Sequence, residues 1–205
     1  MFAVKTEQQL ETGPEAAQVI GGTPNMGQQK NVNLANSLCN EIAVRTIQLF
    51  IRHVSLLRPL AKGGRVRLQA DFQHLENALK IICPHLADLG RPYRLLKSVA
   101  SVIVLSPEEI VAGQTPDSSI PHSTILLMLF AFAGLELASP HQNTSWSLPK
   151  ISAWLDEHQG EGERLDLIAG ALQKYENLVR QKNSINYDPV YPVISQYLER
   201  ALKEI

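Results

Sequence analysis

The stretch RTIQLFIRHVSLLRPLAKGGRVRLQADFQHLENALKII, residues 45–82, carries the repeat that decides the fold. Its large apolar residues recur at steps of three and four positions, which places them along one face of a helix. The two apolar stripes consist of Ile47, Phe50, Val54 and Leu57, and of Leu68, Phe72, Leu75, Leu79 and Ile82. We expect the first helix to stop before Pro59, because the residue that precedes a proline disfavours helical geometry. Lys62-Gly63-Gly64 is predicted to be the turn into the second helix.

The helical period continues toward the C-terminus after Pro84, which should kink or restart the second helix. Further helices are expected over 92–104, from the capping signature Ser106-Pro107, over 122–137, from Ser147, over 164–182 and from Asp188-Pro189 onward. The run VASVIVL, residues 99–105, is β-branched enough to fit a strand as well as a helix. The helix over 122–137 is apolar on nearly every side, so it is predicted to be central and buried. Six or seven helices without a convincing strand predict an all-α fold, an antiparallel helical bundle.

Composition divides the 205-residue chain into two segments. Residues 1–32 are poor in large apolar side chains and rich in Gly, Pro and Gln, so they are predicted to be disordered or loosely packed. Residues 33–205 are predicted to form the helical bundle domain, and a chain of this size buries roughly 70% of its unfolded surface without a metal or disulfide. The most apolar run, ILLMLFAFAGL at 125–135, falls short of the ~20 residues that span a bilayer. No secretory signal opens the chain, so we expect a soluble, cytosolic protein.

The sequence contains no motif for catalysis or cofactor binding. A phosphate-binding loop, a dinucleotide fingerprint, a zinc-protease helix and a nucleophile elbow are all missing. The six histidines never lie three or four positions apart, as a local zinc pair does, and we interpret them as surface or capping residues. Cys39 and Cys83 are interpreted as inert packing residues, and Asp156-Glu157-His158 as a solvated helix end. The sequence therefore predicts neither an enzyme nor a metal or cofactor site.

Charge is distributed unevenly along the chain, although the formal net charge is only −1. Residues 45–97 hold ten Lys or Arg against three acidic residues, whereas residues 98–205 hold seven against thirteen. Such asymmetry can attract an acidic partner or an anionic membrane surface. The alternative is that basic and acidic helices simply pack beside each other and neutralise one another. The candidate partner or membrane surface consists of Arg58, Lys62, Arg65, Arg67, Arg91, Arg94 and Lys97.

An ordered set of segments resembles the C-terminal part of the conserved oligomeric Golgi complex subunit 5 family. The segments are IQLFIRHVSLLRPLAKGGRVRLQADFQHLENAL (47–79), LADLGRPYRLLKS (86–98), WLDEH (154–158), RLDLIAGALQKYENLVR (164–180) and YDPVYPVISQYLERAL (187–202). The resemblance runs from about Ala43 to the end of the chain. The residues before it resemble a family segment that lies further upstream, which places a sequence junction near 39–43. We therefore expect a shortened isoform or an incomplete gene model, with doubtful helix continuity through Asn40.

The resemblance implies a fold and a function that the residue spacings do not show. The fold would be the C-terminal helical bundle of a tethering-complex rod. The function would be that of a non-enzymatic subunit of a Golgi vesicle-tethering complex, which acts in retrograde intra-Golgi transport and Golgi organisation. The implied partners are the other subunits of the complex, especially subunit 7, together with SNARE proteins and coiled-coil tethers. The implied location is the cytosol and the cytosolic face of the Golgi membrane, as a peripheral protein.

Two other functions remain open for the basic part of the chain, residues 45–97. One is a helical module that binds nucleic acid. The near-zero net charge and the aromatic content of only 6% argue against it, because such modules are usually basic and stack bases on aromatic side chains. We therefore expect no nucleic-acid partner. The other is peripheral binding to a membrane surface through the same basic side chains.

Overall fold

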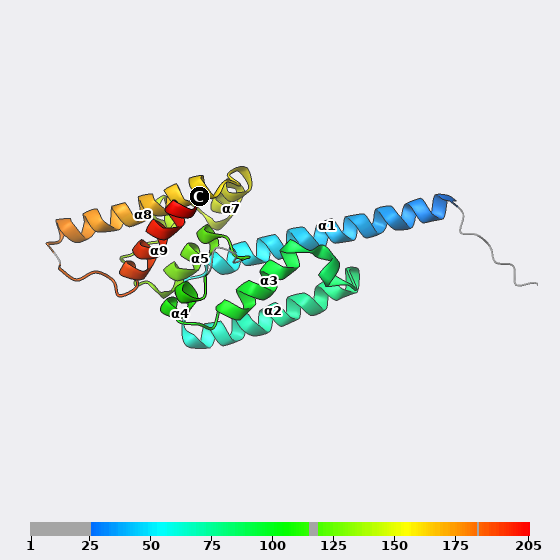
Figure 1. Ribbon diagram of the computed structural model, residues 1–205, viewed down its shortest axis with the longest axis horizontal. Helices are drawn as coiled ribbons and strands as arrows, with labels where there is room; N and C mark the ends of the chain where they lie inside the picture. The colour runs from blue at the N-terminus through cyan, green and yellow to red at the C-terminus, as the bar shows by residue number, and fades with distance from the viewer. Residues whose placement is uncertain (1–25, 115–118, 184) are drawn as a thin grey trace, which may run out of the picture. The chain divides into compact units, whose positions relative to one another are not determined.

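The computed structural model describes residues 26–114, 119–183 and 185–205, and all regular structure within them is helical. The helices are α1 (Met26–Leu56), α2 (Lys62–Ile82), α3 (Arg91–Val102), α4 (Pro107–Ala112), α5 (His122–Leu129), α6 (Pro140–Asn143), α7 (Leu148–Glu157), α8 (Glu161–Gln181) and α9 (Tyr191–Glu204), with single 3₁₀ turns at Leu86–Leu89 and Phe130–Phe132. The all-α prediction is thus confirmed (Figure 1). The chain divides into two compact units, Met1–Ala35 and Asn36–Ile205.

The first unit contributes only the first turns of α1 to the described residues, and residues 30–35 are exposed. Most of the segment predicted to be disordered or loosely packed, residues 1–32, lies outside the described residues, so that prediction and the bundle boundary at 33 stay predictions. Helix α1 runs without a break through residues 39–43, where the sequence suggested a junction.

The core of the second unit is built around α5, which contacts α4, α8 and α9. Every side chain from Ile125 to Phe130 is buried, as the uniformly apolar sequence predicted. The helix is shorter than the expected 122–137, because the backbone becomes extended at Ala133 and leaves the helical path. Gly134 follows, and its N–H donates to the carboxylate of Asp188 at 2.8 Å. A Cβ atom at Gly134 would stand only 3.0 Å from that carboxylate, so a larger residue there would have to displace the Asp188 side chain.

Helices α2 and α3 form a hairpin beside this core (Figure 1). The prediction of a turn at Lys62-Gly63-Gly64 is wrong. Helix α2 already begins at Lys62, and residues 57–61 connect α1 to α2. The connection is anchored by the N–H of Leu60, which donates to the carbonyl of Ala131 at 3.1 Å. The ambiguous run at 99–105 is helical to Val102 and then turns. Its β-branched residues are accommodated because Val99 and Ile103 face the core.

The helix starts follow local capping chemistry. Ser106 caps α4 in a reciprocal capping box with Glu109, and Ser147 caps α7, both as predicted. The last helix begins at Tyr191 rather than at Asp188, because the Asp188 carboxylate bonds to the N–H groups of Val190 (2.9 Å) and Gly134 outside the helix. Helix α6 has no counterpart among the predicted elements.

Candidate functional site

The seven basic residues of the predicted surface do not form one patch. Arg58 lies in the connection before α2, and Lys62, Arg65 and Arg67 lie in the first turns of α2. Arg91, Arg94 and Lys97 lie on the first turns of α3. Lys97 contacts Glu76, which places the α3 group fourteen residues along α2 from Lys62. At 1.5 Å per residue, that separation is about 21 Å along the helix axis.

The side chains of Arg58 and Arg65 form hydrogen bonds with backbone carbonyl groups of the protein itself. Arg58 donates to the carbonyls of Gly134 and Leu137, both at 2.8 Å, and its partial burial lowers the pKa of the guanidinium. Arg65 donates to the carbonyls of Val104 and Leu105 at 3.3 and 3.0 Å. It also lies over the ring of Phe132, at 5.2 Å from the ring centroid. These two side chains hold loops in place, so they are poor candidates for recruiting a partner.

Lys97 is also used within the fold. Its ammonium donates at 2.8 Å to Glu76, a carboxylate whose residue is only 5% exposed. Tyr93 donates to the same carboxylate at 3.3 Å. The hydrogen bond from Lys97 to Glu76 raises the pKa of the ammonium. Because a buried carboxylate without a cation would be costly, Lys97 has a structural role.

Four residues of the predicted surface therefore remain available for contacts. Lys62, Arg67, Arg91 and Arg94 are exposed, and none of them has an ion-pair partner among the described residues. Lys62 and Arg67 flank Val66, which is 62% exposed, at one end of the hairpin. Arg91 stands at the other end, where it lines a cleft.

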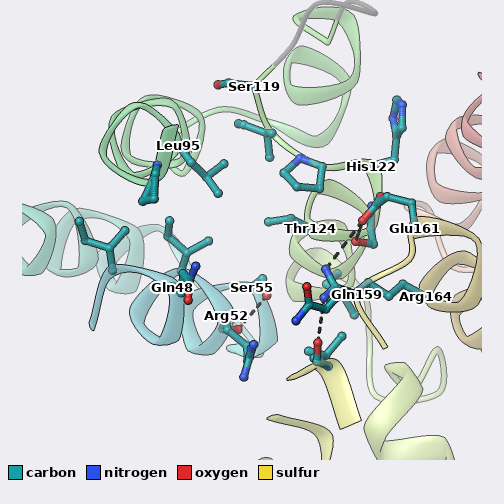
Figure 2. Close-up of a pocket in the computed structure, with 18 of the residues that line it drawn as sticks. Gln48, Arg52, Ser55, Leu95, Ser119, His122, Thr124, Gln159, Glu161 and Arg164 are labelled. Carbon is teal, nitrogen blue, oxygen red and sulfur yellow. Dashed lines mark hydrogen bonds and ion pairs between the residues drawn. The ribbon is translucent and has the colours of Figure 1, made fainter. Parts of the chain in front are cut away.

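A cleft with a volume of about 540 Å³ opens among the described residues. It lies where α1, the start of α3, the start of α5 and the α7–α8 turn meet, and Figure 2 shows side chains entering it from each of these elements. Its apolar lining comprises Ile51, Leu127 and Leu155, which are at least nine-tenths buried, and the half-buried Leu95. A volume in this range is typical of ligand and partner sites.

A charged cluster around Asp156 forms one wall of the cleft. Asp156 accepts two hydrogen bonds from Arg45, at 2.8 and 2.6 Å, and one from Arg52 at 2.7 Å. Arg52 also donates to the carbonyl and the hydroxyl of Ser152, both at 2.8 Å. These guanidinium hydrogen bonds hold the pKa of Asp156 far below its usual range. Asp156 does lie at the end of α7 with its side chain 37% exposed, but its ion pairs also tie α7 to α1, which the interpretation of a solvated helix end left out.

Glu161 and Arg164 form the opposite wall at the start of α8. Glu161 accepts hydrogen bonds from the backbone N–H of Ser123 at 2.9 Å and from its hydroxyl at 2.6 Å. Arg164 donates to the carbonyls of Leu155 and His158, at 2.8 and 2.7 Å, and closes the α7–α8 turn. Both carboxylates of the cleft thus accept hydrogen bonds from groups of the protein.

Three polar side chains that line the cleft lack partners. The guanidinium of Arg91, the amide of Gln48 and the hydroxyl of Thr124 form no hydrogen bond with any other described residue, and they come from α3, α1 and α5. Figure 2 shows Gln48 and Thr124 at the cleft. Arg91 was on the predicted surface, whereas no pattern in the sequence pointed to Gln48 or Thr124. The cleft draws on segments more than 100 residues apart, so no local spacing could have revealed it.

The histidines and acidic residues do not assemble a metal centre within the described ranges. His141 corrects the expectation that the histidines lie at the surface, since it is only 8% exposed. Its Nδ1 lies 3.1 Å from the Ser139 hydroxyl, and burial and the neighbouring Arg58 lower its pKa. Ser139 takes part in the cap of α6, which gives this pair a structural role. No helix in the described ranges is both long and apolar enough to span a bilayer.

Comparison of the sequence with those of known proteins finds three relatives, all with the same name. Conserved oligomeric Golgi complex subunit 5 of Drosophila melanogaster is 48% identical over 167 residues, which cover 81% of this chain and 22% of the relative. The Mus musculus protein of the same name is 41% identical over 164 residues, 80% of this chain and 20% of the relative. The Arabidopsis thaliana protein of the same name is 31% identical over 165 residues, which cover 80% of this chain and 20% of the relative.

The chain thus spans about a fifth of the length of the curated relatives it matches. Neither a protein-family model nor a solved structure matches the chain.

Proposed function

Over about four-fifths of its length the chain is related in sequence to conserved oligomeric Golgi complex subunit 5, and from this premise we propose that it works as a subunit of that Golgi complex. The observation that carries the proposal is the level of identity, 48% with the insect protein and 31% with the plant protein. The all-helical fold is compatible with a protein that works by presenting surfaces.

The finer part of the proposal concerns what the complex does with this subunit. We propose that the chain is non-enzymatic and acts in vesicle tethering during retrograde intra-Golgi transport. Its partners would be other subunits of the complex, above all subunit 7, with SNARE proteins and coiled-coil tethers as further contacts. It would occupy the cytosolic face of the Golgi membrane as a peripheral protein. The resemblance of the sequence to the family supports each of these points.

The experiment is affinity purification of the tagged chain from cells, beside a tagged full-length subunit 5. We expect both to recover the other subunits of the complex, with subunit 7 the most abundant. The matched control is Leu165→Asp, because Leu165 is completely buried in α8 and a charge there should prevent folding. Recovery with the full-length subunit but not with this chain would refute the proposal, as would equal recovery by the Leu165→Asp control.

Peripheral contact with the Golgi membrane has its own structural support. Lys62, Val66 and Arg67 are all exposed near the start of α2, so two cations and one aliphatic side chain lie at the same end of this helix. Such a surface suits anionic headgroups, at about 1 kcal/mol per basic residue. We expect the chain to float with phosphatidylserine vesicles, and Lys62→Glu with Arg67→Glu to abolish flotation. Equal flotation with neutral phosphatidylcholine vesicles would contradict this part of the proposal.

A further inference from the structure

We propose that the cleft between α1, α3, α5 and the α7–α8 turn binds a short polypeptide segment of a partner protein, one that carries a carboxylate side chain next to an aliphatic side chain. The inference rests on the charges, hydrogen bonds and apolar lining of the cleft. It does not depend on the assignment to a Golgi complex, so either proposal can fail without the other.

The residues that line the cleft carry a net positive charge, which favours the binding of an anion. Four guanidinium groups line it, from Arg45, Arg52, Arg91 and Arg164, against the carboxylates of Asp156 and Glu161. With His122 neutral, the lining therefore has an excess of two positive charges. Arg45, Arg52 and Arg164 are held by Asp156 and by backbone carbonyls. Arg91 is the guanidinium whose donors are available, and its planar fork matches a carboxylate in two parallel hydrogen bonds.

A carboxylate fits this arrangement better than a phosphate group. Sites for phosphate usually bring several available cations or N–H groups to one point, whereas here one guanidinium is available. A single negative charge needs only Arg91, and the unpartnered Gln48 and Thr124 are suited to the backbone N–H and carbonyl groups of a peptide.

The apolar lining of the cleft is the reason why we expect an aliphatic side chain next to the carboxylate in the bound peptide. Ile51, Leu127 and Leu155 line the cleft, and each is no more than 7% exposed. An aliphatic side chain that enters this cleft would leave water and contact these apolar side chains. The combination of one available guanidinium, two unpartnered polar groups and an apolar lining matches a peptide rather than a free anion.

The test is binding of a fluorescein-labelled peptide of alternating Glu and Leu to the purified full chain, followed by fluorescence polarisation. We expect saturable binding that weakens with added salt, and an affinity at least about tenfold lower for Arg91→Glu. The matched control is Arg67→Glu, because Arg67 is equally exposed but lies on α2 outside the cleft. Amide chemical shifts of Gln48, Thr124 and Gln159 should move on titration, which locates the peptide.

Four outcomes would overturn the proposal. These are no binding of the Glu-Leu peptide, equal binding of a Gln-Leu peptide, an equal loss in Arg91→Glu and Arg67→Glu, and shifts confined to residues outside the cleft. Inositol hexakisphosphate serves as the phosphate probe. If it binds in the cleft and the Glu-Leu peptide does not, the ligand chemistry is phosphate and the inference is wrong. Thermal melting of each variant confirms that it is folded.

Discussion

Replacing Asp156 with Asn removes the negative charge that joins α1 to α7 while keeping the shape of the side chain. The variant weakens one hydrogen bond from Arg52, whose side chain is 12% exposed, and two from Arg45, which is 48% exposed. A partly buried hydrogen bond to a charged group contributes about 1.5–3 kcal/mol, and an exposed ion pair about 0–1 kcal/mol. Because Asp156 itself is 37% exposed, solvent screening favours the lower end of these ranges. We expect Asp156→Asn to reduce the free energy of unfolding by about 2 kcal/mol.

Urea unfolding at low ionic strength measures this loss, since urea does not screen charge. The fluorescence of Trp154 reports on the region, because its ring stacks on His158 in the α7–α8 turn. At the size of this chain, about 2 kcal/mol corresponds to a melting temperature lower by about 4–8 °C. Asp166→Asn is the matched control, since Asp166 is exposed on α8. A difference between the two variants below about 0.5 kcal/mol would refute the reasoning, because that is the usual scatter for surface substitutions.

The pH dependence of this difference has a definite sign. The folded protein holds the pKa of Asp156 below its value in the unfolded chain, which is about 3.9. The charged carboxylate therefore contributes its full stabilisation above about pH 4–5, and the contribution is lost as the pH falls through the folded pKa. Wild type and Asp156→Asn should converge in stability at acid pH. A gap that stayed constant down to pH 3 would contradict the assignment.

A double-mutant cycle separates the two arginines. The coupling energy between Asp156 and Arg52, measured with Arg52→Met, should exceed about 1 kcal/mol, since this pair is more buried. The coupling with Arg45 should be below about 1 kcal/mol, because Arg45 is half exposed. The reverse order would mean that burial does not control the strength of these pairs.

Three further substitutions test other parts of the fold by urea unfolding and hydrogen exchange. Leu165→Ala should cost about 2–5 kcal/mol because the side chain is fully buried in α8, whereas Leu202→Ala, at 43% exposure, should cost under about 1 kcal/mol; equal losses would contradict this. Ser106→Ala should cost about 1 kcal/mol through loss of the α4 cap, and Ser101→Ala, at an exposed position of α3, should cost less. Arg58→Met should cost about 1–3 kcal/mol and speed amide exchange at residues 134–137, because the carbonyls of Gly134 and Leu137 lose their donor; unchanged exchange would show that the loop holds without it.

Local sequence signals predicted most of the helices but not where several of them begin or end. The stripe beginning at Leu68 was correct in period, yet α2 starts at Lys62 because Gly63 and Gly64 join its first turn. The apolar run after His122 looked like one helix to residue 137, but it ends at Leu129 and a 3₁₀ turn. Gly134 then makes a close contact with Asp188, a residue 54 positions away. Such partners are invisible to any window of local periodicity.

The cleft and its charged walls show the same limit more strongly. Asp156 was interpreted as part of a solvated helix end because the adjacent residues Asp156, Glu157 and His158 point in different directions on a helix. Its partners Arg45 and Arg52 lie 111 and 104 residues earlier in the chain. In the same way, three of the seven basic residues on the predicted surface, Arg58, Arg65 and Lys97, are committed to contacts within the fold. Charge density along a sequence therefore says little about which cations remain available.

The sequence by itself determined the all-α class, the buried central helix, the serine caps of α4 and α7 and the relation to the Golgi complex subunit. All of these depend on the periodicity, capping chemistry and order of residues, which are properties of the linear chain. Only the tertiary structure decided which charges pair, which residue the Gly134 turn contacts and where a cleft opens. Those features depend on distances between segments that the chain brings together only when it buries its apolar stripes in one core.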